Sequence, residues 1–249
     1  MLSMFAKPRV FKALIMENKD LNYLAYSEKI DDGEKLQYWH RFNFDFIKDR
    51  IKDKKILDIG CWTGGLEYYL NDFSCEPYAI DIDERALSIA RLKFPQIKFQ
   101  VGNAWSIPFA DGYFDVVALS FVLEHIKDAK ELKTLAEINR VLKPGGIFLL
   151  CVPAGNIISR LVDPAYFLGR HRHYNKRRLK KILSSAGFEI VKLAYRGGWY
   201  NTSKMLLFYF YKFVLRRQLP ELKWLEQKIA AEFQHPGYDG VFLIAKKHE

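Results

Sequence analysis

The chain has 249 residues, of which 49% are hydrophobic and 15% aromatic, so it can bury a large core and is not a disordered protein. Its three cysteines lack metal-binding spacing and no signal peptide is recognisable, so we expect a cytoplasmic protein. The net charge of +10 is uneven, because residues 1–150 carry 21 basic and 22 acidic side chains and residues 151–249 carry 18 and 7. This asymmetry indicates a surface that faces phosphates, anionic lipid or nucleic acid, with a solvated basic face as the alternative.

The chain then divides by pattern. The first fifty residues predict helices docked on a core, because apolar side chains recur near helical spacing from Leu36 to Ile47. From Lys55 onward, strands and helices alternate. Strands joined by helices of this length predict right-handed crossovers and a mostly parallel sheet with helices on both faces. The predicted strands are 55–60, 77–81, 97–102, 114–120, 146–152, 188–195 and 240–245, and the predicted helices are 65–71, 84–93, 129–142 and 176–186.

Residues 198–237 lie between the last two predicted strands. Within them, the run 205–217 is apolar, aromatic and basic, and it is too short to span a bilayer. It predicts a core helix, a substrate lid, or an interfacial helix that makes peripheral membrane contact through 204–217. The predicted parts of the chain are an N-terminal helical cap (1–50), a core (51–197), a helical insertion or lid (198–237) and a last core strand (238–249).

The segment from Ile56 to Leu66 predicts a ligand-binding turn. A buried strand carries an acid, Asp58, and is followed by Gly60 and Gly64, which permit positive φ and leave bare backbone for a ligand. The free N–H groups of the next helix point into the same space. The segment does not supply the G-x-G-x-x-G of a dinucleotide-binding fingerprint.

An acid at the end of the second strand predicts a ribose contact. Asp81 follows the glycine turn by about twenty residues, and its carboxylate can accept hydrogen bonds from both ribose hydroxyls. A cap or turn residue is the alternative. Asp83 is instead predicted to be the N-cap of helix 84–93.

Together these segments resemble the class I S-adenosylmethionine-dependent methyltransferases. The glycine turn is similar to the D-x-G-x-G-x-G loop of that family, with Trp62 in place of the middle glycine. Residues 101–117 are similar to its G-D-A-x-x-L-P-F-x-D-x-x-F-D-x-V stretch, and residues 120–126 and 142–146 also match in order. The resemblance implies a seven-stranded Rossmann-like sheet whose last strand is antiparallel, with S-adenosylmethionine as cofactor and S-adenosylhomocysteine as product.

The resemblance also implies the cofactor contacts. In the family the acid of G-D-A meets the adenine amino group, and the amide oxygen of Asn103 can accept that hydrogen bond instead. Trp105 is predicted to flank the adenine ring, with core packing as the alternative. The predicted cofactor-binding residues are Asp58, Gly60, Cys61, Trp62, Gly64, Asp81, Ile82, Asn103, Ala104, Trp105 and Ser120.

Two histidine-containing segments follow strands at the predicted ligand edge. His125 and His173 are the candidates for a catalytic base. Arg170, His171 and Tyr174 are the candidates for contacts with the substrate. The alternatives are a capping or packing role for His125 and an architectural role for the segment 170–174. No metal site is predicted, because no suitable ligand spacing is present.

We therefore expect a methyltransferase that acts on a small or medium acceptor, at oxygen, with a hydrophobic, lipid-like or phosphate-bearing acceptor favoured. Residues 120–123 do not read Asn/Asp-Pro-Pro-Tyr/Phe, and Cys151 lies inside a strand run, which counts against methylation of nucleic-acid bases. RNA methylation through the basic C-terminal surface is the first alternative, and it predicts salt-sensitive RNA binding. A cofactor-binding module without turnover, docked on a membrane or a partner, is the second.

Overall fold

A seven-stranded sheet forms the centre of the computed structural model, which describes residues 38–167 and 171–248. The strand order is β3-β2-β1-β4-β5-β7-β6, and β7 runs antiparallel to both of its neighbours while the pairs from β3 to β5 are parallel. This confirms the predicted Rossmann-like sheet with its antiparallel last strand. The strands are β1 (Lys55–Ile59), β2 (Glu76–Asp81), β3 (Lys98–Val101), β4 (Phe114–Ser120), β5 (Leu142–Pro153), β6 (Phe188–Arg196) and β7 (Gly240–Lys247).

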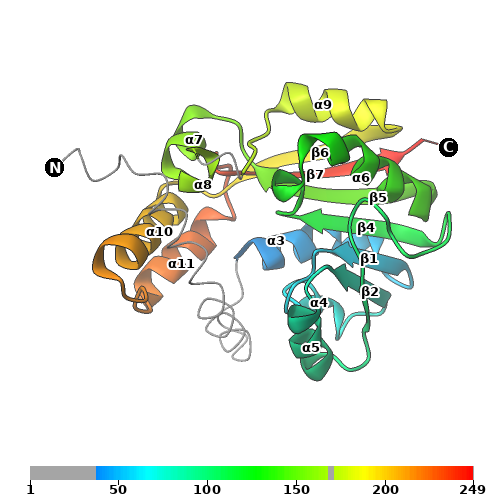
Figure 1. Ribbon diagram of the computed structural model, residues 1–249, viewed down its shortest axis with the longest axis horizontal. Coiled ribbons are helices and arrows are strands. Elements are labelled where there is room, and N and C mark those ends of the chain that lie inside the picture. Colours follow the sequence, from blue (N-terminus) through cyan, green and yellow to red (C-terminus); the bar gives the residue numbers. More distant parts are fainter. Residues whose placement is uncertain (1–37, 168–170, 249) are drawn as a thin grey trace. The chain divides into compact units, whose positions relative to one another are not determined.

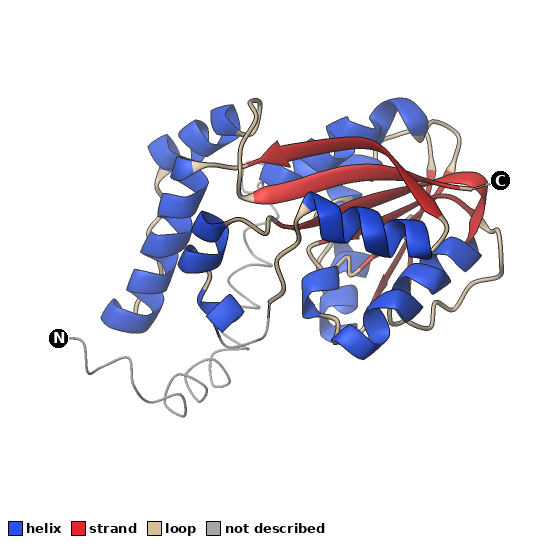
Figure 2. Ribbon diagram, turned by 90° about the horizontal axis from the view of Figure 1, so that it is seen from above, coloured by secondary structure: helices blue, strands red, loops and turns tan. Residues whose placement is uncertain are grey.

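Helices cover both faces of the sheet (Figures 1 and 2). Side chains of α6 and α9 pack on one face, and those of α3, α4, α5 and α11 pack on the other. Because both faces are covered, the central strands are almost continuously apolar. The helices are α3 (Tyr38–Ile47), α4 (Glu67–Leu70), α5 (Glu84–Lys93), α6 (Asp128–Val141), α7 (Ile157–Val162), α8 (Pro164–Phe167), α9 (Lys176–Ser185), α10 (Trp199–Phe210) and α11 (Lys223–Glu232). Short helical turns lie at η2 (Lys48–Arg50), η3 (Leu123–His125) and η4 (Tyr211–Leu215), the last being π-helical.

Several predicted boundaries were wrong. The helix predicted at 65–71 is only the four-residue α4, because positive φ angles at Trp62 and Gly64 prolong the preceding turn. The sequence pattern gave no indication of α7 and α8, which are too short to show helical periodicity. Leu36 and the rest of residues 1–37 of the predicted cap lie outside the described residues.

The insertion predicted at 198–237 contains two helices, α10 and α11. Only Thr202 of α10 is fully buried, whereas Leu206, Phe208 and Phe210 are exposed. The apolar run is therefore not a core helix. Its α-helical part ends at Phe210, and η4 continues it to an αL residue at Arg216. Among the residues that the structure describes, no helix has the length and apolar character needed to span a membrane.

Helix α3 is fixed to the carboxyl ends of β4 and β5 by a fully buried amide. Asn43 Nδ2 donates to Ser120 Oγ at 2.9 Å, and the Cys151 thiol donates to Asn43 Oδ1 at 2.9 Å. One turn earlier, the His40 ring lies against Gly65, where an added Cβ would come within 2.0 Å of His40 Nε2. Burial lowers the pKa of His40 to about 3, so this ring is neutral.

Arg140 of α6 holds the loop between β3 and β4. Its guanidinium donates to the carbonyls of Ile107 and Phe109 at 2.9 and 2.8 Å. The same group forms ion pairs with Glu137 at 2.8 Å and Asp111 at 2.7 Å. Five N–H donors in a fixed plane allow one side chain to satisfy all these partners.

We predict that Arg140→Lys lowers the free energy of unfolding by about 1–3 kcal/mol, because lysine cannot replace the two carbonyl contacts. Urea denaturation measures this change, and hydrogen exchange should accelerate in residues 107–111. Arg91→Lys is the matched control, since its ion pair with Glu84 is exposed and is worth at most about 1 kcal/mol, and its one carbonyl contact, to Phe99, is long at 3.4 Å. Equal destabilisation by both substitutions would contradict the assignment of Arg140 as the group that holds the loop.

Candidate cofactor and acceptor site

The glycine turn after β1 is tightly packed and fixed to the end of β2. Gly60 has φ +78°, and an added Cβ would meet Val122 Cγ2 at 2.3 Å. Trp62 also has a positive φ of 48°, which is a strained conformation for a bulky side chain. The Trp62 N–H nevertheless donates to Asp81 Oδ2 at 2.9 Å. The turn therefore reaches the neighbouring strand although Trp62 stands where the family has glycine.

Asp81 lies at the centre of this arrangement. Its other oxygen, Oδ1, accepts the N–H of Asp83 at 2.9 Å. Each carboxylate oxygen can accept a second hydrogen bond, and the side chain is half-exposed, so the group can still receive a ribose diol. Asp83 caps α5 by accepting the N–H of Arg85 at 2.9 Å, which confirms its predicted role. Ile82 between them is 69% exposed and borders the same space.

A pair of buried carboxyl groups lies beneath the turn. Asp58 of β1 and Glu67 of α4 are within hydrogen-bonding reach of each other. Asp58 Oδ1 and both Glu67 oxygens make no well-formed hydrogen bond to a donor among the described residues. Two ionised carboxylates only accept, so a bond between them requires a shared proton. Accordingly, burial raises the pKa of Asp58 to about 7 and that of Glu67 well above its usual value.

Cys61 shares this acidic environment. Its side chain is buried. Burial is the main cause, and the nearby carboxyl groups are the lesser cause, of a thiol pKa well above its usual value. The thiol therefore stays protonated and acts as a small packing group. Sequence reasoning missed Glu67. The available signal was an acid between Leu66 and Leu70, two residues of the buried face.

The loop after β3 carries an acceptor that no described residue uses. Asn103 Oδ1 is buried and has no hydrogen-bond partner. Ala104 beside it is buried, and Trp105 is half-buried with Lys130 Nζ 3.9 Å from the centre of its ring. A buried amide oxygen without a donor fits the amino group of an adenine, which is the contact predicted for Asn103. Trp105 packs against the core, as its alternative interpretation proposed.

Ser120 ends β4 at the same edge of the sheet. Its hydroxyl accepts the hydrogen bond from Asn43, so its visible role is to hold α3. The next residue, Phe121, has φ +54°, and its N–H donates to the Cys151 carbonyl at 2.9 Å. The chain turns there into η3, which carries His125.

The carboxylate of Asp163 contacts two histidines at this edge of the sheet. Its Oδ2 atom lies 2.9 Å from His171 Nδ1 and 3.0 Å from His173 Nε2. The ring of His125 stands edge-on to His171 with 4.5 Å between ring centres. Sequence reasoning noted Asp163 as the one carboxylate close to His171 and His173 in sequence but gave it no role, because only the fold shows that it contacts both rings.

The two histidines differ in what they can do. His173 Nδ1 lies 2.9 Å from the Ala154 carbonyl and Nε2 lies 3.0 Å from the Asp163 carboxylate, so both ring nitrogens are already hydrogen-bonded within the protein. Neither nitrogen of this buried ring is left to contact a substrate. His171 donates through Nδ1 to Asp163, which leaves Nε2 as an acceptor on a half-exposed ring. Burial and the neighbouring His171 hold the pKa of His125 below its usual value, although the residue keeps an exposed edge.

Tyr174 is fully buried, which favours the architectural alternative for this residue. Its hydroxyl donates to Glu131 Oε1 at 2.7 Å, and Arg178 lies 3.1 Å from the other oxygen of that carboxylate. A hydroxyl held in this way is not free for a substrate. Arg170 lies outside the described residues. Within the described parts of the chain, no group of three or more histidine, cysteine or acidic side chains is arranged to hold a metal ion.

Comparisons with known proteins agree with this fold. A family model described as a methyltransferase domain matches residues 57–150. A TehB-like S-adenosylmethionine-dependent methyltransferase from Corynebacterium glutamicum superposes with a TM-score of 0.60 at 16% identity, over 91% of this chain and 96% of that one. At such low identity the superposition supports the fold alone.

Relatives found by sequence share a higher identity with this chain than that structure does. The chain is 29% identical to a probable S-adenosylmethionine-dependent methyltransferase of Mycolicibacterium smegmatis over 61% of its own length and 60% of that protein. It is 33% identical to an uncharacterized methyltransferase of Synechocystis over 58% and 72% of the two chains. It is also 33% identical to a demethylmenaquinone methyltransferase of Symbiobacterium thermophilum over 59% and 60%. The match thus spans between 60% and 72% of these relatives, and the family implies S-adenosylmethionine as the cofactor. The chain belongs to the class I S-adenosylmethionine-dependent methyltransferases.

Proposed function

We propose that this protein transfers the methyl group of S-adenosylmethionine to an oxygen atom of a small or medium acceptor that is hydrophobic or phosphate-bearing. The observation that carries the proposal is a set of buried oxygen atoms, beneath the glycine turn and in the loop after β3, that receive no hydrogen bond other than the proton shared within the Asp58–Glu67 pair. These acceptors are Asn103 Oδ1, Asp58 Oδ1 and the oxygens of Glu67. A ligand with an amino group at one end and an ammonium group at the other fits this set.

The cofactor supplies a methyl group already activated on a sulfonium, so the protein's work is to bind, orient and exclude water. In this proposal Asp81 holds the ribose and Asn103 the adenine edge. The acidic pair of Asp58 and Glu67 provides negative charge for the positively charged end of the cofactor. The N–H of Trp62 keeps its bond to Asp81, which favours a working site over a module that has lost turnover.

Oxygen methylation also requires that the acceptor hydroxyl lose its proton. We assign this role to His171, because Asp163 fixes its Nδ1–H and leaves Nε2 free to accept. His173 positions Asp163 from the opposite side, and His125 packs against the ring of His171. The predicted catalytic roles of His125 and His173 thus become supporting ones in this proposal.

The exposed surface of the insertion supports a hydrophobic or lipid-like acceptor. Leu206, Phe208 and Phe210 of α10 are exposed, as are Ile157 and Leu161 of the neighbouring α7. Basic residues border them at Lys212, Arg216 and Arg217. Apolar side chains flanked by cations are typical of an interfacial element, which favours peripheral membrane contact through 204–217. One relative is named a demethylmenaquinone methyltransferase, and a quinone precursor is an acceptor of this class.

RNA methylation is the competing proposal. The exposed basic side chains of α9 favour it, since they form a cationic row on the surface. Such binding would weaken steeply with added salt, because phosphate contacts release counterions. These side chains are Lys176, Arg177, Lys180 and Lys181.

We predict that Asp81→Ala weakens S-adenosylmethionine binding at least tenfold, which corresponds to the roughly 1.5–3 kcal/mol of a charged hydrogen-bonded contact. Isothermal titration calorimetry measures the affinity. Asp49→Ala removes an exposed acid of η2 and should leave the affinity unchanged. An unchanged affinity in a folded Asp81→Ala protein would remove the ribose assignment.

Glu67→Gln should stabilise the cofactor-free protein at pH 8 by a few degrees in Tm, and much less at pH 5. The folded-state pKa of Glu67 lies above its unfolded value of about 4.5, so its contribution is present below that pH and is lost as the pH rises. Glutamine cannot ionise and escapes this loss. Thermal melts between pH 5 and pH 8 test the prediction, with the exposed Glu84→Gln as control. A Tm difference that does not change with pH would show that Glu67 is not a buried acid of raised pKa.

His171→Gln should reduce methyl transfer to a hydroquinone test acceptor by about 10²-fold or more, because the proton acceptor is lost. Formation of S-adenosylhomocysteine reports the rate, and the cofactor affinity should stay the same. His235→Gln, an exposed histidine after α11, is the control. A rate that survives His171→Gln would argue against base catalysis by this residue.

A further inference from the structure

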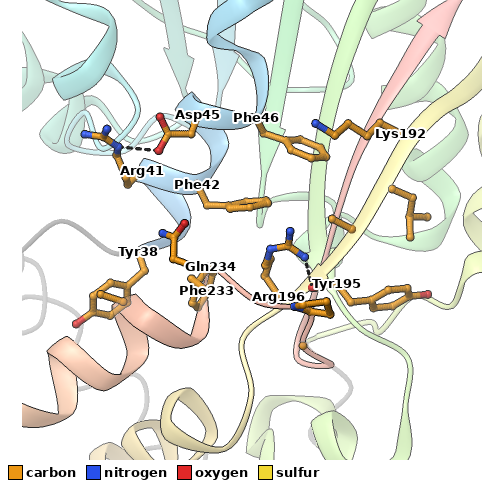
Figure 3. Close-up of a pocket in the computed structure, with 15 residues that line it drawn as sticks. Tyr38, Arg41, Phe42, Asp45, Phe46, Lys192, Tyr195, Arg196, Phe233 and Gln234 are labelled. Atoms are coloured by element: carbon orange, nitrogen blue, oxygen red, sulfur yellow. Dashed lines mark hydrogen bonds and ion pairs between the residues drawn. The ribbon is translucent and has the colours of Figure 1, made fainter.

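A cavity lies away from the glycine turn. It has a volume of about 660 Å³, which is within the range of ligand pockets. Three elements form its walls: α3, the edge strand β6, and the end of α11 with the loop that follows (Figure 3). Neither Asp81 nor Asn103 nor His171 lines it. It is therefore a separate feature from the cofactor and base residues described above.

Two basic side chains of β6 enter this cavity without an acidic partner. Lys192 and Arg196 are four residues apart on a strand, so they project from the same face. Lys192 Nζ lies 4.3 Å from the centre of the Phe46 ring, and the Arg196 guanidinium lies 4.7 Å from that of Phe42. Within the described residues, neither forms an ion pair. The side-chain hydrogen bond of Arg196 goes to the carbonyl of Tyr195.

Arg196 in particular has donor capacity that the protein does not use. Its Nε atom is buried and has no hydrogen-bond partner. Burial also lowers its pKa, which is the direction expected for a cation removed from water and not compensated by an acid. The third basic residue of the cavity, Arg41, differs because it is paired with Asp45 at 2.8 Å. An unpaired guanidinium at the wall of a cavity indicates an anionic ligand.

The remaining lining indicates that this ligand also has an apolar part. Phe42 and Phe46 stack with 5.2 Å between ring centres, and Phe233 of α11 lies edge-on to Phe42. Figure 3 shows the basic groups of Lys192 and Arg196 beside this group of aromatic rings. Phe46 and Phe233 are buried, so the half-buried Phe42 offers the apolar surface of the cavity. A small inorganic anion would leave that surface in water, and a neutral apolar molecule would leave the guanidinium without an anionic partner.

The position of the cavity follows from the strand register. Arg196 pairs with Gly240 of β7, and Gly240 pairs with Pro153 of β5. Arg196 is therefore at the carboxyl edge of the sheet, three strand spacings from β4, or about 14 Å. A group bound there is too far from the end of β4 to be the reacting atom itself. It is close enough to be the far end of a long acceptor or a separate ligand.

We propose that the cavity between α3, β6 and α11 binds a long-chain phosphate monoester, with the phosphate on Arg196 and Lys192 and the chain against the phenylalanine rings. This concerns binding alone and does not depend on methyl transfer. It would explain why Lys192 and Arg196 of β6 have no acidic partner.

Calorimetric titration of the full chain without S-adenosylmethionine tests the proposal, with dodecyl phosphate below its micelle concentration as the probe. We expect micromolar affinity, with inorganic phosphate and dodecanol each binding at least 100-fold more weakly. Arg196→Gln should weaken dodecyl phosphate at least tenfold. Lys192→Gln replaces an exposed side chain and leaves the core intact, and it should weaken the binding of dodecyl phosphate at least threefold.

Lys133→Gln is the matched control, because it removes the same charge from an exposed position of α6 on the opposite face of the sheet. It should bind dodecyl phosphate as the unaltered protein does. The proposal is overturned if dodecyl phosphate does not bind at millimolar concentration, if dodecanol or inorganic phosphate binds equally well, or if Lys192→Gln and Arg196→Gln both keep full affinity. Titration of each variant with S-adenosylmethionine runs in parallel, so failure of this cavity and failure of the cofactor site are distinguishable.

Discussion

The hydrogen bond from the Trp62 N–H to Asp81 is the constraint on which the site depends. It joins the turn after β1 to the end of β2, and the second oxygen of Asp81 then accepts the N–H that begins the approach to α5. One carboxylate thus sets the position of two neighbouring strand ends and of the space between them. The carboxyl ends of parallel strands lie at one edge of a sheet, and this hydrogen bond fixes the positions of two of them, β1 and β2, relative to each other.

The sequence predicted the sheet well because most of its strands contain an apolar run and the longer helices, such as α5, α6 and α9, show helical periodicity. It also singled out the turn, Asp81 and Asn103 as candidates for cofactor binding, since these lie in contiguous motifs. It did not identify Asp163 or Glu67. Asp163 acts through histidines that reach it only after α7 and α8 have formed, and Glu67 is unusual only because it is buried. Both properties arise from tertiary packing, which no local pattern encodes.

The excess basic residues in the second part of the chain lie on several different surfaces. The basic side chains of α9 are exposed to solvent, whereas Arg178 and Arg172 contact the buried Glu131 and serve the fold. Lys192 and Arg196 lie over aromatic rings beside a cavity. A total of charges therefore gives little information about function until the fold assigns each residue to a surface.

Helix α3 contacts both ligand regions. His40 packs on Gly65 and Asn43 bonds to Ser120, while Phe42 and Phe46, on another side of the same helix, line the cavity. A helix shared in this way offers a physical connection between the two regions. If an occupant of the cavity changes how tightly the cofactor is held, the cofactor must change the affinity of that occupant by the same factor. Occupancy of one region would then regulate the other without any contact between the two ligands.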